Sequence, residues 1–435
     1  MSSISLWRWG SLPAEHRANF IHLYLDIAWF GILNGSAIAF AAIYATRLGA
    51  NSFQIGLLSA SPAIISLIFT LPAGQWLQRH PISKGVFWTS VVYRFFYLTW
   101  VMLPWLFDPQ GQITWLIILT LMMSIPGTAL AVGFNALFAG AVPPEWRGHV
   151  TGVRNALLAI AFIISSTACG YVLEKLPFPV GYQVVFAIGF VGAAMSSVHL
   201  WFLRPHGDVA SRPRTGRGLG DFARPGTSMT WAQAARATVG LRYLVQRVRP
   251  LLNLRVLRQP FGKIIFLLFA FHLGQYLAIP LFPVFWVNDL HLTDPQIGLG
   301  NSVFYFTVFL GSTQLGRLTD RFGNKKLLAV GILAMSSYPV LTAMTTNLTM
   351  FLLTAAIGGL AWSVVGGAIS NYILERIPPD DRPANLAWYN LALNAAVLLG
   401  SLLGPLLAGG IGLIPTLLVA AVIRFAAALA LAKWG

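Results

Sequence analysis

Charged residues are scarce in this chain. Asp, Glu, Lys and Arg make up 10% of its 435 residues, whereas soluble proteins carry about 25%. Only 13 residues are acidic, and 56% of the chain is hydrophobic. Such a composition excludes a water-soluble fold and predicts a protein embedded in a lipid bilayer.

Cysteine is almost absent as well. The single residue, Cys169, lies in an apolar segment, so it can form neither an intramolecular disulfide nor a cysteine-based metal site. We interpret it as a small packing residue. The first twenty residues also lack the apolar run and cleavage site of a secretory signal, so we expect them to be retained.

Motifs of enzymes are missing too. The sequence has no Walker A loop, no HExxH pair, no Cys/His zinc cluster and no paired carboxylates inside an apolar run. GRGLG at 216–220 is only a weak phosphate-loop lookalike, because it follows no strand, and we interpret it as a flexible loop. We therefore expect no enzyme activity, no direct use of ATP, no cofactor and no metal.

Long apolar runs fill most of the chain. A helix needs about 20 apolar residues to cross a bilayer, and about twelve such runs lie between charged or Pro/Gly-rich breaks, which predicts an all-α polytopic membrane protein. First-half spans are expected at 20–46, 53–78, 85–106, 113–141, 149–173 and 181–203. Second-half spans are expected at 262–287, 296–316, 326–345, 349–374, 384–411 and 414–432. The expected parts are a six-helix bundle at 1–203, a basic linker at 204–260 and a second six-helix bundle at 261–435.

The formal charge of +16 is concentrated in the linker, where eleven arginines lie between Arg204 and Arg258. Clustered basic residues can indicate a nucleic-acid partner. Their position between two apolar blocks instead favours a cytoplasmic segment beside anionic lipid headgroups. We therefore expect membrane lipids, and no nucleic acid, as its partners.

Basic residues also follow alternate breaks between the spans. One set of breaks holds Arg79, Arg154 and Arg376 with other basic residues, whereas the other set holds little beyond Arg47 and Lys175. Because short loops rich in Lys and Arg stay in the cytoplasm, we predict cytoplasmic termini. The expected location is the cell, or inner, membrane.

The two halves share a repeated motif. QIGL at 54–57 recurs at 296–299, and each copy is followed after the same interval by a glycine, Gly74 or Gly316. A second pair, VPPEWRG and IPPDDRP, recurs in the same order. These repeats indicate duplicated halves related by an axis along the membrane normal, with a ligand site near the midplane between them.

GRLTDRFGNKK at 316–326 resembles the hallmark loop of the major facilitator superfamily, Gly-x-x-x-Asp-Arg-x-Gly-x-Lys-Lys. The resemblance implies two six-helix bundles and transport by alternating access, with this loop as a conformational gate. We expect Gly316 to allow close helix packing, Gly323 to permit a tight reversal and Asp320 to contact a helix N-terminus or an arginine. The basic residues expected to hold the loop at the cytoplasmic interface are Arg321, Lys325 and Lys326.

The first-half copy of this loop is less complete. GQWLQRHPISK at 74–84 keeps Gly74, Arg79 and Lys84. It has Gln78 and Pro81 where the family has the acid and the second glycine. This departure weakens the prediction of a matching gate in the first half.

Ionisable side chains inside the spans are candidate functional groups, because each costs about 3 kcal/mol on insertion scales. Asp26 is the only carboxylate within an expected span, and Arg94 lies at a similar depth in the third span. An ion pair between them is expected, with Asp26 either coupling a proton or serving as a structural partner of Arg94. His272, in the seventh span, is either a second coupling candidate or a hydrogen-bonded packing residue. Arg424 is expected to be peripheral, with its head group at the interface.

Uncharged candidates for a substrate cavity follow from the family resemblance, which assigns cavity-lining positions to particular helices. These candidates are Asn34, Asn135, Gln275, Tyr276, Trp362, Asn371, and Asn390 or Asn394. With so few charges available, a polyanionic substrate would lack partners. Neutral, weakly polar or amphipathic cargo fits better.

The sequence thus predicts a monomeric, proton-coupled secondary transporter of a small molecule. GSLLGPLLAGG at 400–410 resembles the antiporter signature of the family and slightly favours efflux, although it lies in the eleventh span rather than the fifth. Its small residues also suit simple close packing. An uptake symporter and a flippase-like protein that handles lipids or lysolipids remain as alternatives.

Overall fold

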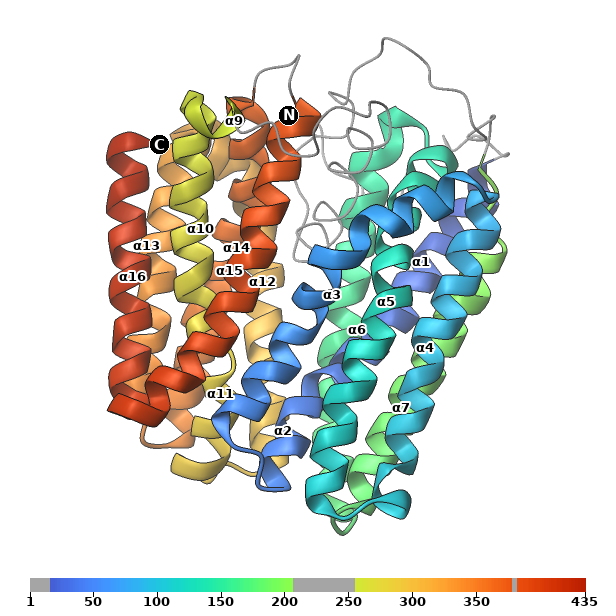
Figure 1. Ribbon diagram of the computed structural model, residues 1–435, viewed down its shortest axis with the longest axis vertical. Helices are drawn as coiled ribbons and strands as arrows, with labels where there is room; N and C mark the ends of the chain where they lie inside the picture. The colour runs from blue at the N-terminus through green and yellow to red at the C-terminus, as the bar shows by residue number, and fades with distance from the viewer. Residues whose placement is uncertain (1–15, 206–254, 378–381) are drawn as a thin grey trace.

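The computed structural model describes residues 16–205, 255–377 and 382–435, and its long elements are helices (Figure 1). The first half contains α1 (Arg17–Leu33), the π-helical turn η3 (Asn34–Ile38), α2 (Ala39–Arg47), α3 (Ser52–Gln78), α4 (Ile82–Leu106), α5 (Pro109–Ala141), the 3-10 turn η4 (Pro144–Trp146), α6 (Arg147–Lys175) and α7 (Val180–Trp201). The second half contains α9 (Arg255–Arg258), α10 (Pro260–Ala278), α11 (Leu281–Val284), the π-helical turn η6 (Phe285–Asp289), α12 (Asp294–Phe322), α13 (Asn324–Met344), α14 (Leu348–Arg376), α15 (Arg382–Ile411) and α16 (Leu413–Trp434).

Eleven helical segments of the described residues are long and apolar enough to cross a membrane. They correspond to the expected spans except the eighth, which is the 29-residue helix α12. Polar residues such as Asn301, Ser302 and Gln314 make α12 less apolar than the others. It nevertheless packs between α14 and α6, in the position of the missing span.

The QIGL repeat begins the second helix of each half. Asn51 accepts a hydrogen bond from the backbone of Gln54, whose side chain accepts one from the backbone of Asn51, and together they form a capping box. Thr293 and Gln296 form the same box at the start of α12. The repeated motif therefore fixes where two equivalent helices begin.

The helices form two bundles that stand side by side, with α3 packed against α15 and α6 against α12 where the bundles meet (Figure 1). Small residues allow this close approach. A Cβ atom added at Gly56 would lie 2.2 Å from the Ser401 carbonyl oxygen, and one at Gly298 would lie 2.8 Å from the Ser166 carbonyl oxygen. Both glycines lie in the first two turns of their helices, so this close approach lies near the end where α3 and α12 begin.

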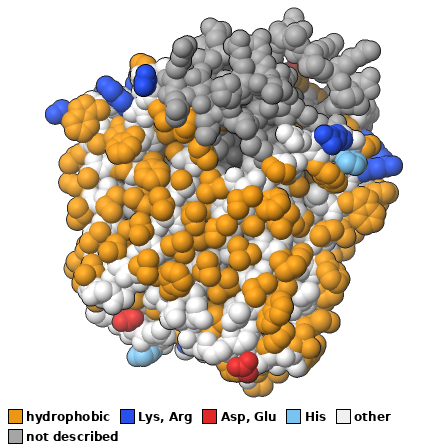
Figure 2. Space-filling model, viewed as in Figure 1, with side chains coloured by type: hydrophobic (Ala, Val, Ile, Leu, Met, Phe, Trp, Pro, Cys, Tyr) orange, Lys and Arg blue, Asp and Glu red, His pale blue; other side chains and the backbone are white. Residues whose placement is uncertain are grey.

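The two ends of the bundles differ in charge. The visible face is hydrophobic over its middle, with Lys and Arg side chains at one end and acidic side chains at the other (Figure 2). The basic end carries the start of α1, the α12–α13 connection and the C-terminus. Most of the expected basic linker, residues 206–254, and the first fifteen residues lie outside the described ranges.

Candidate functional site

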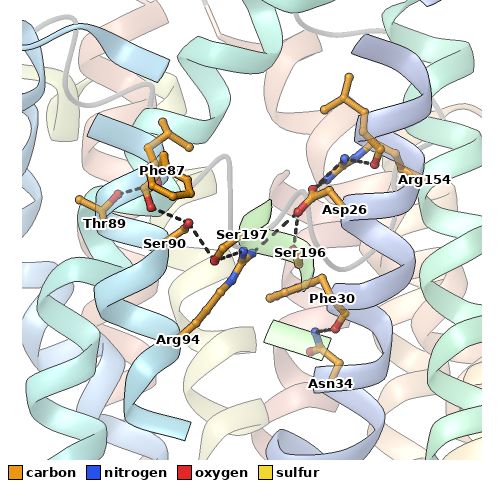
Figure 3. Close-up of polar contacts among 12 residues, drawn as sticks. Asp26, Phe30, Asn34, Phe87, Thr89, Ser90, Arg94, Arg154, Ser196 and Ser197 are labelled. Atoms are coloured by element: carbon orange, nitrogen blue, oxygen red, sulfur yellow. Dashed lines mark hydrogen bonds and ion pairs between the residues drawn. The ribbon is translucent and has the colours of Figure 1, made fainter. Parts of the chain in front are cut away.

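A cluster of buried polar side chains lies inside the first half (Figure 3). Asp26 comes from α1, Arg94 from α4 and Arg154 from α6, and their exposed fractions are 3%, 4% and 8%. At a rise of 1.5 Å per residue, each lies about 10 to 18 Å along its helix from the basic end. The cluster is therefore well inside the bundle.

Arg154 is the closer partner of Asp26. Its Nη1 and Nη2 atoms both lie 3.1 Å from Asp26 Oδ2, and Nη1 also donates to the Leu23 carbonyl oxygen at 2.5 Å. The guanidinium carbon lies 4.9 Å from the centre of the Phe134 ring, within the range of a cation–π interaction. Charge-assisted hydrogen bonds thus join α6 to α1.

Arg94 contacts the other carboxylate oxygen less closely. Its Nη2 atom lies 3.8 Å from Asp26 Oδ1, and its Nη1 atom donates to Ser197 Oγ at 2.9 Å. Ser196 Oγ donates a short hydrogen bond to the same Asp26 oxygen. Asp26 therefore accepts contacts from α4, α6 and α7 together.

The cluster holds one negative and two positive charges. Among the described residues, Asp26 is the only buried carboxylate, and it offsets part of the cost of burying two guanidinium groups. Protonation of Asp26 would remove both ion pairs at once and weaken the attachment of α1 to α4 and α6. A carboxylate in this place can link a proton to helix movement.

The expected ion pair of Asp26 with Arg94 is present, but the closer partner of Asp26, Arg154, was not predicted. Arg154 was grouped with the basic residues at the ends of the spans, whereas its side chain points into the bundle toward Asp26. Its place inside an apolar run is the signal that marks it as a buried cation. The pairing joins residues 128 positions apart, which no local pattern reveals.

His272 lies in the second half and is hydrogen-bonded on both ring nitrogens. Nδ1 is 3.3 Å from Gln275 Oε1, and Nε2 is 3.2 Å from the Tyr389 hydroxyl. The side chain is 4% exposed. These contacts join α10 to α15. They are the kind expected if His272 is a hydrogen-bonded packing residue, the second of the two hypotheses for it.

Gln275 and Trp362 are the two cavity candidates that line a partly open cavity of about 210 Å3 in the second half. The other candidates lie elsewhere. Asn34 donates to the Phe30 carbonyl oxygen, Asn135 to that of Ala131 and Asn394 to that of Asn390, so these three amides bond to their own helices. Tyr276 packs at the edge of the hydrophobic core of the second half, and Asn371 lies half-buried in α14.

Arg424 lines the same cavity, and the expectation that it is peripheral is wrong. The residue is 1% exposed, and its guanidinium donates to the carbonyl oxygens of Met335 and Gln275. The prediction had placed its head group at the membrane interface, since α16 is the last span of the chain. Packing against α13 and α10 turns this arginine inward.

The hallmark loop lies at the basic end, and two of its residues lack the contacts expected of them. Gly323 has φ 74° and forms the reversal between α12 and α13, as expected. Gly316 and Asp320 are exposed, nothing lies within 4 Å of a Cβ added at Gly316, and no ion pair joins Asp320 to a described residue. The expected close packing at Gly316 and the expected contact of Asp320 with a partner are therefore not made in this conformation.

The remaining loop residues lie at the same end of the bundles. They are Arg321 at the end of α12, Lys325 and Lys326 at the start of α13, and, in the first-half copy, Gly74, Arg79 and Lys84 around the α3–α4 connection.

The opposite end is closed by contacts between the halves. Arg47, at the end of α2, bonds to Asp294 with Nη2 at 3.0 Å from Oδ1 and also donates to the Leu292 carbonyl oxygen. Thr167 and Ser302 share a hydrogen bond of 2.9 Å between α6 and α12. The halves are thus joined at the end where acidic residues gather.

Comparisons with known proteins agree with this architecture. The family model described as Major Facilitator Superfamily matches residues 27–262 and 264–434. The structure of the nucleoside transporter NupG superposes with a TM-score of 0.65 and 15% identity, over 95% of this chain and 98% of that one. At this identity the likeness shows the fold alone.

Two curated relatives match part of the sequence. The quinolone resistance protein NorA of Staphylococcus aureus is 27% identical over 143 residues, which is 33% of this chain and 37% of that protein. Multidrug resistance protein 1 of Bacillus subtilis is 27% identical over 164 residues, or 38% of this chain and 42% of that protein. The match thus spans well under half of either relative.

Proposed function

Because the chain belongs to the major facilitator superfamily, we propose that it is a secondary active transporter that exports a small, weakly polar or amphipathic molecule in exchange for protons. It is an integral multi-pass membrane protein and not an enzyme. The observation that carries the proposal is the buried Asp26 cluster in a two-bundle fold whose halves are joined by an ion pair at the acidic end.

The conformation supports alternating access. Ion-pair and small-residue contacts join the halves at the acidic end, whereas Gly316 and Asp320 of the hallmark loop make no such contact with the described residues. Loops rich in Lys and Arg stay in the cytoplasm, so the basic end, with the start of α1 and the C-terminus, is proposed to face the cytoplasm. Rocking of one bundle against the other would close this end and open the other.

Asp26 is the proposed coupling residue. In the conformation described here, its carboxylate forms ion pairs with Arg154 and Arg94. A proton that reaches Asp26 competes with the two guanidinium groups and releases α1 from its neighbours. Rearrangement of α1 against α6 would then change the contacts of α6 with α12, at the interface between the halves.

Export of drug-like compounds is favoured by the partial similarity to NorA and to Multidrug resistance protein 1, whose names state resistance to quinolones and to multiple drugs. The aromatic cavity of the second half, about 210 Å3 in volume, suits one or two fused rings of an amphipathic cargo. Lipid or lysolipid handling is the second candidate function, because an apolar cavity also accepts acyl chains.

Proteoliposomes with an imposed pH difference test the proposal. With the protein present, norfloxacin should accumulate in the compartment from which protons leave, and a fluorescent lysolipid should not change leaflet faster than in empty vesicles. Lysolipid movement without norfloxacin movement would replace the proposed function by the second candidate. Movement of neither compound would reject drug export as the function.

A further inference from the structure

The partly open cavity of the second half is built largely from aromatic rings. Phe282 and Trp286 stack with centroids 6.0 Å apart, and the Tyr338 ring meets Phe282 edge-on at 5.1 Å. The cavity volume of about 210 Å3 lies below the 300 to 1,000 Å3 of pockets for drug-sized ligands. A ligand with one or two fused rings therefore fits.

Arg424 places a positive charge in the wall of this aromatic cavity. Its Nη1 donates to the Met335 carbonyl oxygen at 3.0 Å, and its Nη2 donates to the Gln275 carbonyl oxygen at 3.2 Å. A guanidinium carries five N–H donors, and Nε has no hydrogen-bond partner among the described residues. No carboxylate within the described ranges forms an ion pair with it.

Arg424 differs in this respect from the buried arginines of the first half. Arg94 and Arg154 share the carboxylate of Asp26, whereas Arg424 has only carbonyl oxygens as partners. A buried cation without a counter-charge carries a large desolvation cost. An anionic ligand in the cavity would supply the missing charge.

A second hydrogen-bond donor lines the cavity. Trp362 is 8% exposed, and its indole Nε1 is buried with no partner among the described residues. Buried N–H groups are normally satisfied. Two unsatisfied donors in the wall of one cavity indicate that a ligand with acceptor atoms completes it.

We propose that this cavity binds a small aromatic monocarboxylate, with the carboxylate accepting hydrogen bonds from Arg424 and, on its other side, from Trp362. The ring system packs against Phe282, Trp286 and Tyr338. One carboxylate matches the single charge of Arg424, and a second anionic group would find no partner. The proposal names the substrate class of the transporter proposed above and rests on that function only for the step from binding to transport.

The cavity also reaches the interface between the halves. Tyr305, from α12, lines it and stacks on Phe162 of α6 with ring centroids 3.7 Å apart. A ligand that packs against Tyr305 therefore contacts one ring of a stacked pair that joins the two bundles. Occupancy of the cavity can in this way favour one arrangement of the halves over the other.

Calorimetric titration of the purified full-length protein in detergent tests the proposal with two probes of equal shape, 2-naphthoate and its neutral amide, 2-naphthamide. Wild-type protein should bind the carboxylate at least tenfold more tightly than the amide. In Arg424→Gln, affinity for 2-naphthoate should fall by about tenfold to a hundredfold, the loss expected for hydrogen bonds to a charged group. Affinity for 2-naphthamide should change by less than about threefold, which also shows that the cavity persists.

Arg317→Gln is the matched control, because it removes an exposed arginine from α12, and it should bind both probes like wild type. Trp362→Phe keeps an aromatic wall but lacks the donor and should weaken 2-naphthoate binding several-fold, so this variant tests the site if Arg424→Gln does not fold. Equal affinity of wild type for the two probes, or no binding of either, would overturn the proposal. Because binding is measured without a membrane, a protein that binds 2-naphthoate but transports nothing would refute the proposed function and leave this inference standing.

Discussion

At the scale of single residues, the buried charge of the described ranges is concentrated in four side chains. Asp26, Arg94 and Arg154 form one network in the first half, and Arg424 lies alone in the second. The two arginines differ in how closely they contact the Asp26 carboxylate. Arg154 makes two contacts of 3.1 Å with it, and Arg94 makes one of 3.8 Å. The two arginines should therefore contribute differently to stability.

Replacement of each arginine by glutamine tests this inequality. Arg154→Gln removes the closest partner of a buried carboxylate and should lower the free energy of unfolding by about 3 kcal/mol, as for other broken buried ion pairs. Arg94→Gln leaves Asp26 paired with Arg154 and removes the excess positive charge, so its cost should be clearly smaller. Unfolding in detergent, followed by intrinsic tryptophan fluorescence, measures both. Equal losses for the two variants would contradict the ranking of the contacts.

At the scale of helices, α6 and α12 determine how closely the halves approach. Ser166 donates to the Gly298 carbonyl oxygen at 3.2 Å, and Thr167 bonds to Ser302 beside it. Small residues at helix crossings permit such close backbone contact in a membrane. This crossing lies near the acidic end and helps to close it.

Gly298→Val should loosen the crossing and open the acidic end. The first carbon of the new side chain would lie 2.8 Å from the Ser166 carbonyl oxygen, which is part of the backbone and has little room to move. Spin labels are placed at Asp108 and Thr346 in a Cys169→Ala background. Double electron–electron resonance should show that a larger share of molecules has a long distance between the two labels than in the same protein with Gly298. Gly152→Val is the control, because it lies on α6 with open space around it. An unchanged distance distribution in Gly298→Val would show that this crossing does not hold the end closed.

At the scale of the whole molecule, we predict that contacts of the hallmark loop and contacts at the acidic end belong to opposite conformations. Asp320 has no ion pair with a described residue here, so any partner it has in the other conformation stabilises that conformation selectively. Asp320→Asn should therefore shift the population toward the conformation described here. The same spin labels measure the shift, and Glu174→Gln, an exposed acid at the other end, is the control. A shift toward an open acidic end would contradict the assignment of Asp320 to the other state.

Much of this architecture could be predicted from the sequence. The apolar runs predicted the spans, and the QIGL repeat, from which duplicated halves were predicted, begins equivalent helices with capping boxes. The inward direction of Arg154 and Arg424 could not be predicted, because it depends on which helices pack together. A buried side chain finds its partner across the bundle, and hydrophobic periodicity along one helix carries no information about that partner.

The central claim, that Asp26 couples protons to transport, is tested most directly by Asp26→Asn in proteoliposomes loaded with norfloxacin. The amide keeps the shape of the side chain but cannot exchange a proton. In this variant, accumulation driven by a pH difference should be lost, while exchange of labelled for unlabelled norfloxacin without a gradient should continue within about threefold of the wild-type rate. Accumulation against a gradient at the wild-type level in Asp26→Asn would contradict the account and assign Asp26 a purely structural role.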